Sequence, residues 1–373
     1  MIARLPMLCP DLEHITFGDL PRHPVITKAV SEMLLACNPD TLQRFLVDSP
    51  LTEAAREVVY RLPKLIGLWV VIRGRTLLPT VVLPNLTFID VEYDDRLDWL
   101  QGFRRATLGK LKAVHFRTPQ SKPIGDFLGE FETAALTTSV SNTLSTFQFH
   151  TSCSWNPNYR SLLPFTQLQD LLIEFSCDNG CSSTVDDNII VDLARAMPKL
   201  QILRFGGNPC GAGGGVTVKG LIALARGCRL LSTLRIHFRT ASLVEAATVV
   251  EVPSPSDDET VIRRQDCNLT DLEVGKIPIP DRSKWEVTVT LLQIFPHLLN
   301  IKFIEAKWRE VKETIKLIKR IGTFVRRTGK SHLPYLWSPS VTFCQAMRLI
   351  LGIHRNSAFY RFSSNAWYRV HIT

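Results

Sequence analysis

The sequence predicts an α/β solenoid, in which short parallel strands stack into one curved sheet and helices line its outer side. Two observations predict it: a six-residue apolar pattern recurs along nearly the whole chain, and helix-like segments separate its copies. With 373 residues, of which 45% are hydrophobic and 21% charged, the chain has enough apolar material for such a body.

The recurring pattern is a leucine, two residues, an apolar residue, one residue and a second apolar residue, as in Leu12/Ile15/Phe17. This is the strand signature of leucine-rich repeats. The first leucines of the copies are Leu12, Leu42, Leu65, Leu86, Leu111, Leu144, Leu168, Leu200, Leu231, Leu269 and Leu298. They predict about eleven irregular repeats, because the steps between them range from 21 to 38 residues.

A proline stands two residues before the first leucine in five of these copies. The five are Pro10, Pro63, Pro84, Pro198 and Pro296. Because proline cannot continue a helix, it ends the helical segment ahead of the strand. The shared phase argues against a chance recurrence of the leucine pattern.

Helical segments are expected between the strands, at residues 25–37, 52–62, 124–140, 187–197, 217–228 and 285–295. In the fourth of these, Ile189, Ile190, Leu193 and Met197 fall on one helical face. Since strand and helix alternate, the strands are expected to be parallel and the helices to lie outside.

The expected organisation has three parts: a solenoid at residues 1–305, a basic amphipathic capping helix at 306–330 and an extension without repeats at 331–373. The net charge of +9 is local, because residues 305–373 hold thirteen Lys and Arg against three acids. The basic helix is one alternative binding element for an acidic surface or RNA. A solvated basic face is the commoner case, so nucleic acid is not expected as a partner.

Partner-binding residues are predicted on the concave face of the sheet. Successive strand side chains point to opposite faces, so the fourth residue after each first leucine points away from the core. These residues are Thr16, Leu46, Trp69, Asp90, His115, Gln148, Leu172, Arg204, Arg235, Glu273 and Lys302. Aromatic and arginine side chains dominate interface hot spots. The predicted contact residues are therefore Trp69, Asp90, His115, Arg204, Arg235, His237 and Lys302.

Catalytic, cofactor and metal sites are not expected. The glycine-rich segment 206–220 lacks the lysine followed by Ser or Thr of a phosphate loop, and Cys177 and Cys181 have no second pair to complete a zinc site. No nucleophile or acid can be assigned to the histidines by spacing. The chain is thus predicted to be non-enzymatic, with no cofactor.

The expected location is the cytoplasm, the nucleus or both, without a membrane segment. Residues 1–17 carry no long apolar run of a secretory signal. The nine cysteines are odd in number and scattered, which is typical of reduced thiols that serve mostly as small core residues.

Four segments, at residues 193–210, 217–238, 267–275 and 290–303, resemble the leucine-rich-repeat region of fungal F-box proteins, and the similarity covers roughly residues 1–330. Cys9 and Cys228 stand three residues before a first leucine, as in the cysteine-containing repeat class of these proteins. The resemblance implies a substrate-recognition subunit of a Skp-cullin-F-box ubiquitin ligase. Its implied partners are a protein substrate on the concave face, a Skp adaptor and a cullin.

The F-box itself is not visible ahead of the repeats, the first of which begins by Met7. Two alternatives follow: the F-box belongs to a longer protein, or the chain is a repeat-only scaffold unconnected to ubiquitination. A third alternative is that the chain binds an acidic surface or nucleic acid through the basic helix.

Overall fold

The computed structural model describes residues 2–18, 20, 22–72, 82–93, 100, 103–118, 127–152, 158–176, 185–206, 215–249, 267–274, 277–280 and 283–328, the side chains of 248–249 and 321–328 excepted. The chain divides into two compact units, Met1–Ile315 and Lys316–Thr373. The predicted extension at 331–373, Cys177 and Cys181 lie outside the described residues.

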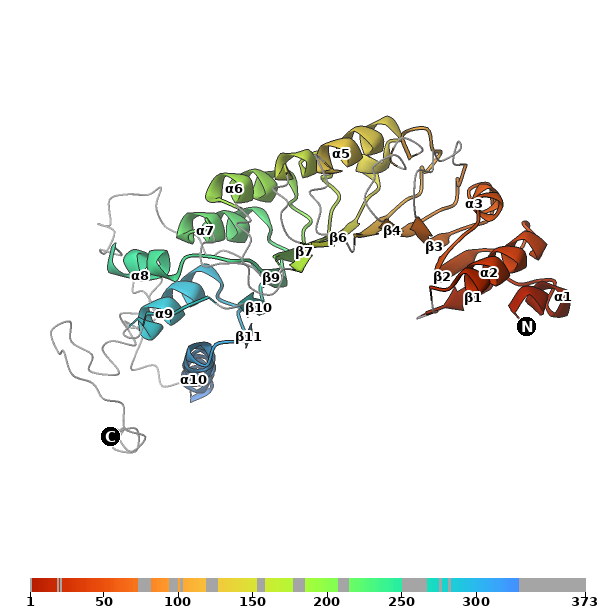
Figure 1. Cartoon of the computed structure of the whole chain (residues 1–373). Coiled ribbons are helices and arrows are strands. Elements are labelled where there is room, and N and C mark those ends of the chain that lie inside the picture. Colours follow the sequence, from red (N-terminus) through yellow and green to blue (C-terminus); the bar gives the residue numbers. More distant parts are fainter. Residues whose placement is uncertain are drawn as a thin grey trace. The chain divides into compact units, whose positions relative to one another are not determined.

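Within the described residues, eleven strands form one parallel sheet whose order follows the sequence (Figure 1). The strands are β1 (His14–Phe17), β2 (Arg44–Pro50), β3 (Gly67–Ile72), β4 (Phe88–Tyr93), β5 (Ala113–Arg117), β6 (Thr146–Ser152), β7 (Asp170–Ser176), β8 (Ile202–Phe205), β9 (Thr233–Arg235), β10 (Asp271–Val274) and β11 (Asn300–Phe303). Each strand begins two residues after the first leucine of one copy of the pattern. The predicted fold class, an α/β leucine-rich-repeat solenoid, is confirmed.

Helices connect the strands, and α5, α6 and α7 lie along one side of the sheet (Figure 1). The helices are η1 (Ile2–Arg4), α1 (Leu5–Leu8), α2 (Pro24–Ala36), α3 (Glu53–Val59), α5 (Phe127–Thr137), η2 (Val140–Asn142), η3 (Tyr159–Leu162), α6 (Asp187–Ala196), α7 (Val218–Gly227), α8 (Thr240–Val249), α9 (Lys284–Ile294) and α10 (Lys307–Thr328). Every predicted helix is present, with ends shifted by no more than three residues. The sequence prediction missed α1 and α8.

A repeated backbone hydrogen bond aligns the starts of neighbouring strands. The residue after each first leucine offers a carbonyl that accepts two N–H groups of the next repeat. Gln43, for example, accepts from Ile66 N at 2.7 Å and from Gly67 N at 3.2 Å. The same arrangement runs from Glu13, which bonds Gln43 and Arg44, to Thr270. The repeats are therefore locked in one register although their lengths differ.

The third residue after each first leucine forms a continuous row in the core. No member of this row exposes more than 7% of its surface. The row is Ile15, Phe45, Leu68, Ile89, Val114, Phe147, Leu171, Leu203, Leu234, Leu272 and Ile301. Burial of apolar side chains at this spacing is the main stabilising contribution to such a stack.

Side-chain caps join adjacent repeats on the helical side. Asp186 Oδ1 accepts from Ile189 N at 2.9 Å and so caps α6. Asp187 caps the following helix, α7: its Oδ1 accepts from the backbone of Thr217 and Gly220, and its Oδ2 accepts from Thr217 Oγ1 at 2.6 Å. Carboxylates placed there stabilise the exposed N–H groups of a helix start.

The described cysteines fall into two groups. Cys228 and Cys267 are buried, and their Sγ atoms donate to the carbonyls of Met197 at 3.6 Å and of Cys228 at 3.8 Å. Burial raises the pKa of the Cys228 thiol to about 12. The predicted core role is confirmed for these two, whereas Cys9 is exposed and Cys37 half-buried.

The beginning of α10 belongs to the core of the first unit. Trp308 is fully buried, and its Nε1 donates to the Ile277 carbonyl at 2.7 Å. Val311 and Ile315 are buried in the same core. Residues 307–315 thus cover the apolar side of the last repeat.

Candidate protein-binding surface

The side of the sheet away from the core carries three rows of side chains, at the second, fourth and sixth positions after each first leucine. We call this side the open face. Its fourth-position row is continuous: strand pairing aligns Trp69 with Asp90, Asp90 with His115, and Arg204 with Arg235. The row ends at Lys302 on β11. The geometry places six of the seven predicted contact residues in one line, as their spacing indicated.

The seventh predicted contact residue, His237, lies two residues beyond β9, at the sixth position of its repeat. It lies beside Gly206, where an added Cβ would come within 3.1 Å of the imidazole Cδ2. Gly206 has a φ of +99°, a conformation that favours glycine. His237 and Gly206 therefore belong to the sixth-position row of the open face, where they lie side by side.

Aromatic and charged groups gather on β3, β4 and β5. Asp90 Oδ2 accepts from Arg117 at 2.7 Å and lies 3.7 Å from His115 Nδ1. The Arg117 guanidinium lies over the Trp69 ring, 5.2 Å from its centroid. Phe88 meets the imidazole of His115 edge-on, with ring centroids 4.9 Å apart. This part of the face is therefore built from an edge-on pair of rings, an arginine over an indole and one shared carboxylate.

Two glutamates organise the charges from β6 to β11. Glu174 lies 3.3 Å from His150 Nδ1 and accepts from Arg235 at 3.0 Å. Glu273 accepts from Arg204 at 3.3 Å and from Lys302 at 3.0 Å. Arg204 and Arg235 are thus each oriented by a carboxylate two strands away, and Lys302 by one on the adjacent strand. These ion pairs fix the direction of the basic side chains before a partner arrives.

The pKa values of two carboxyl groups on this face shift in opposite directions. Burial raises the pKa of Asp170, against the hydrogen bond from Gln148 and the charge of Arg204. The hydrogen bond from His150 lowers the pKa of Glu174, with help from the charge of Arg235. Glu174 is therefore held as a carboxylate.

We expect Glu174→Gln to reduce the pH dependence of stability. A carboxyl group whose pKa is lowered on folding stabilises the fold fully above its ordinary value of 4.5, and that contribution is lost as the pH falls through the lower folded value. The variant should be less stable than the parent at pH 6, by at most about 1 kcal/mol, and the difference should be smaller at pH 3. Urea unfolding at both pH values measures this.

Glu57→Gln, at an exposed glutamate of α3, is the matched control. It should leave the pH dependence unchanged. An equal loss for Glu174→Gln at pH 3 and pH 6 would show that the carboxylate charge contributes nothing.

Several charged members of the open face were missed in the sequence. Four lie at the sixth position, at Asp48, Glu92, Arg117 and Glu174, and Arg22 reaches the face from outside the strands. The signal was present for the four, because the sixth position has the same parity as the fourth and so the same direction. Arg22 had no such signal.

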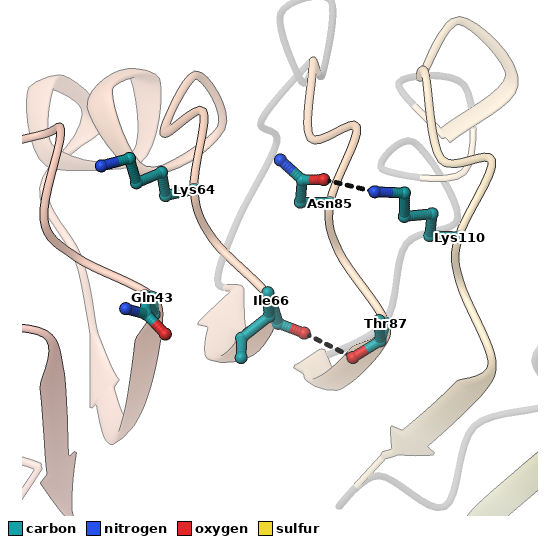
Figure 2. Close-up of a pocket in the computed structure, with 6 residues that line it drawn as sticks. All are labelled: Gln43, Lys64, Ile66, Asn85, Thr87 and Lys110. Carbon is teal, nitrogen blue, oxygen red and sulfur yellow. Dashed lines mark hydrogen bonds between the residues drawn. The ribbon is translucent and has the colours of Figure 1, made fainter.

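A second feature, a solvent-open hollow of about 360 Å³, lies at the starts of β2 to β5 and contains none of the predicted contact residues. Figure 2 shows its polar lining: Lys110 Nζ donates to Asn85 Oδ1 at 2.7 Å, and Thr87 Oγ1 donates to the Ile66 carbonyl at 2.9 Å. Lys64 also lines it. These bonds connect adjacent repeats, and the hollow is separate from the predicted contact row.

The described residues contain no group of three or more His, Cys, Asp and Glu side chains placed to hold a metal ion. None of the described helices has the length and apolar composition that crossing a bilayer requires.

The fold and this face define a leucine-rich-repeat solenoid with a mixed-charge sheet surface. No family model matches the chain. No curated protein matches it either. Among solved structures, an internalin from Listeria monocytogenes is similar at 12% identity, over 74% of this chain and 76% of that chain, with a TM-score of 0.36.

Proposed function

We propose that this chain is a non-enzymatic protein-interaction module that holds its partner on the open face. One observation carries the proposal: the register lines up Trp69, Asp90, His115, Arg204 and Arg235 across strands that are far apart in sequence. Tryptophan and arginine, which supply three of these five side chains, are enriched at the centres of protein interfaces. The core side of the same sheet is covered by helices, so the open face is the side left for a partner.

The partner role that we propose is substrate recognition in a Skp-cullin-F-box type ubiquitin ligase. The support for this step is the resemblance of the repeats to those of fungal F-box proteins. A repeat-only scaffold uses the same face, and the two functions differ only in whether ligase subunits are recruited.

Affinity capture from a fungal lysate tests both steps. The parent chain is compared with Trp69→Ala/Arg204→Ala/Arg235→Ala and with a control, Arg195→Ala/Lys219→Ala/Arg226→Ala, whose three residues are exposed on α6 and α7. We expect the first variant to recover at least about tenfold less of the bound proteins, because a single hot-spot truncation of about 2 kcal/mol already weakens affinity roughly thirtyfold. The control should recover the parental set.

Mass spectrometry of the captured proteins separates the alternatives. A Skp adaptor and a cullin among them support the ligase role, whereas their absence beside other open-face partners supports the scaffold. Equal recovery by all three proteins would contradict binding through the open face.

A further inference from the structure

An acidic and aromatic patch lies on the open face at the N-terminal end of the sheet, on the neighbouring strands β2, β3 and β4 (Figure 1). We define the acidic patch as Asp48, Trp69, Asp90 and Glu92. Asp90 and Trp69 are aligned in the fourth-position row, and Glu92 follows in the sixth. The patch thus brings three carboxylates and one indole together on three strands.

An arginine from elsewhere in the chain already binds this patch. Arg22, between β1 and α2, places one guanidinium nitrogen 2.6 Å from Glu92 Oε1 and another 3.3 Å from Asp48 Oδ1. The hydrogen bond to Glu92 raises the pKa of Arg22 against its partial burial. Its side chain remains 38% exposed, so solvent reaches the ion pairs. The two carboxylates therefore form a guanidinium site whose occupant lies at the surface.

A second arginine shows what the rest of the patch recognises. Arg117 donates to Asp90 Oδ2 at 2.7 Å and lies over the ring of Trp69. A carboxylate beside an aromatic face suits a planar guanidinium, which bonds with its edge and stacks with its plane. Lysine offers a point charge without this plane.

The patch also keeps polar capacity that these two arginines leave unused. Asp90 is only 3% exposed, yet within the described residues its Oδ1 accepts no hydrogen bond. Trp69 Nε1 is buried and likewise lacks an acceptor among the described residues. A buried carboxylate oxygen without a donor is costly, so an added donor there stabilises the site. Among the described residues, the three carboxylates pair with two guanidinium groups, those of Arg22 and Arg117.

We propose that the acidic patch recognises an arginine-bearing segment of a protein partner, which takes the place of Arg22 on Asp48 and Glu92. The inference rests on the proposed function, since it assigns a partner chemistry to one end of the open face. The carboxylates exclude nucleic acid phosphates, and charge complementarity favours a basic peptide. Arg22 acts as an internal competitor that keeps the acid pair neutralised when no partner is bound.

Two synthetic peptides, one of alternating arginine and glycine and one of alternating lysine and glycine, test this with the full chain by fluorescence anisotropy at low salt. The arginine peptide should bind more tightly than the lysine peptide. Asp48→Asn/Glu92→Gln should weaken arginine-peptide binding about tenfold, because both acceptors lose their charge.

Arg22→Gln supplies the readout that a purely structural ion pair would not change. Removing the internal competitor should strengthen arginine-peptide binding by about threefold to tenfold, since the acid pair no longer exchanges one guanidinium for another. Unchanged or weaker binding by Arg22→Gln, with circular dichroism showing an intact fold, overturns the proposal.

The matched acidic control is Glu273→Gln on β10, whose carboxylate also accepts from two basic side chains. Parental peptide affinity is expected. If this control weakens binding as much as Asp48→Asn/Glu92→Gln, the open face binds basic peptides without a dedicated acidic patch. That result would contradict the acidic patch and leave the proposed function intact. Absence of any peptide binding would also contradict arginine recognition by the patch. The proposed function is tested separately, by affinity capture with the Trp69→Ala/Arg204→Ala/Arg235→Ala variant.

Discussion

Replacing Phe131 with alanine is expected to lower the free energy of unfolding by about 3 to 5 kcal/mol. Phe131 is fully buried in α5, and its ring packs against those of the strand residues Phe116 and Phe147, with centroids 5.4 and 5.1 Å away. The ring of Phe165, from the following repeat, lies at 5.4 Å. Alanine leaves a cavity where two repeats meet, so neighbouring units lose contacts together.

Leu136→Ala is the matched control, because Leu136 lies on the same helix and is 50% exposed. It should change the free energy of unfolding by no more than about 0.5 kcal/mol. Urea unfolding followed by circular dichroism measures both variants. Similar losses for the two would show that the aromatic cluster does not hold the repeats together.

Gly227→Ala is the second change with a large expected effect, a loss of about 1 to 3 kcal/mol from overpacking. Gly227 ends α7, and a Cβ there would lie 2.8 Å from the carbonyl carbon of Ala194 in α6 and closer still to its oxygen. Backbone cannot move aside as a flexible side chain does. The two helices must therefore separate, which disturbs the repeat that Cys228 begins.

Gly109→Ala controls for the intrinsic effect of the substitution, since a Cβ at Gly109 meets nothing within 4 Å. It should leave the thermal midpoint unchanged or raise it slightly. A midpoint for Gly227→Ala that equals the Gly109→Ala value would contradict the close contact between α6 and α7.

The strand positions and the fourth-position row could be predicted because both depend on short-range periodicity. Because strand side chains alternate between the two faces, the residues between the apolar positions must point away from the core, and Trp69 and Arg204 lie on that face. The unequal steps between repeats did not change this prediction. The backbone ladder at the strand starts sets the register independently of loop length.

Helix α8 (Thr240–Val249) was missed because its sequence, TASLVEAATV, carries neither a clear apolar stripe nor an acidic start. Short 3₁₀ and helical turns such as η1 and α1 carry even less signal. Their formation depends on contacts with α2, which only the folded chain supplies.

The pairing of charges across the open face could not be predicted from the sequence. Arg22 and Glu92 are 70 residues apart, and Arg204 and Glu273 are 69 apart. Such pairs depend on which strands become neighbours and on how far a long side chain reaches. The sequence indicated a row of separate charges. The structure instead has ion pairs that link the strands, and one of the paired carboxylates, Asp90, is only 3% exposed.

The most direct test of partner binding on the open face is site-specific photo-crosslinking. A benzophenone amino acid is placed at Ile202, a half-buried residue beside Arg204 on the open face, or at Lys219, an exposed residue of α7. Each protein is irradiated in the fungal lysate, and the adducts are identified by mass spectrometry. Binding on the open face predicts protein adducts from position 202 that are lost in the Trp69→Ala/Arg204→Ala/Arg235→Ala variant, and no specific adducts from position 219. Adducts that form from position 219 alone would contradict it.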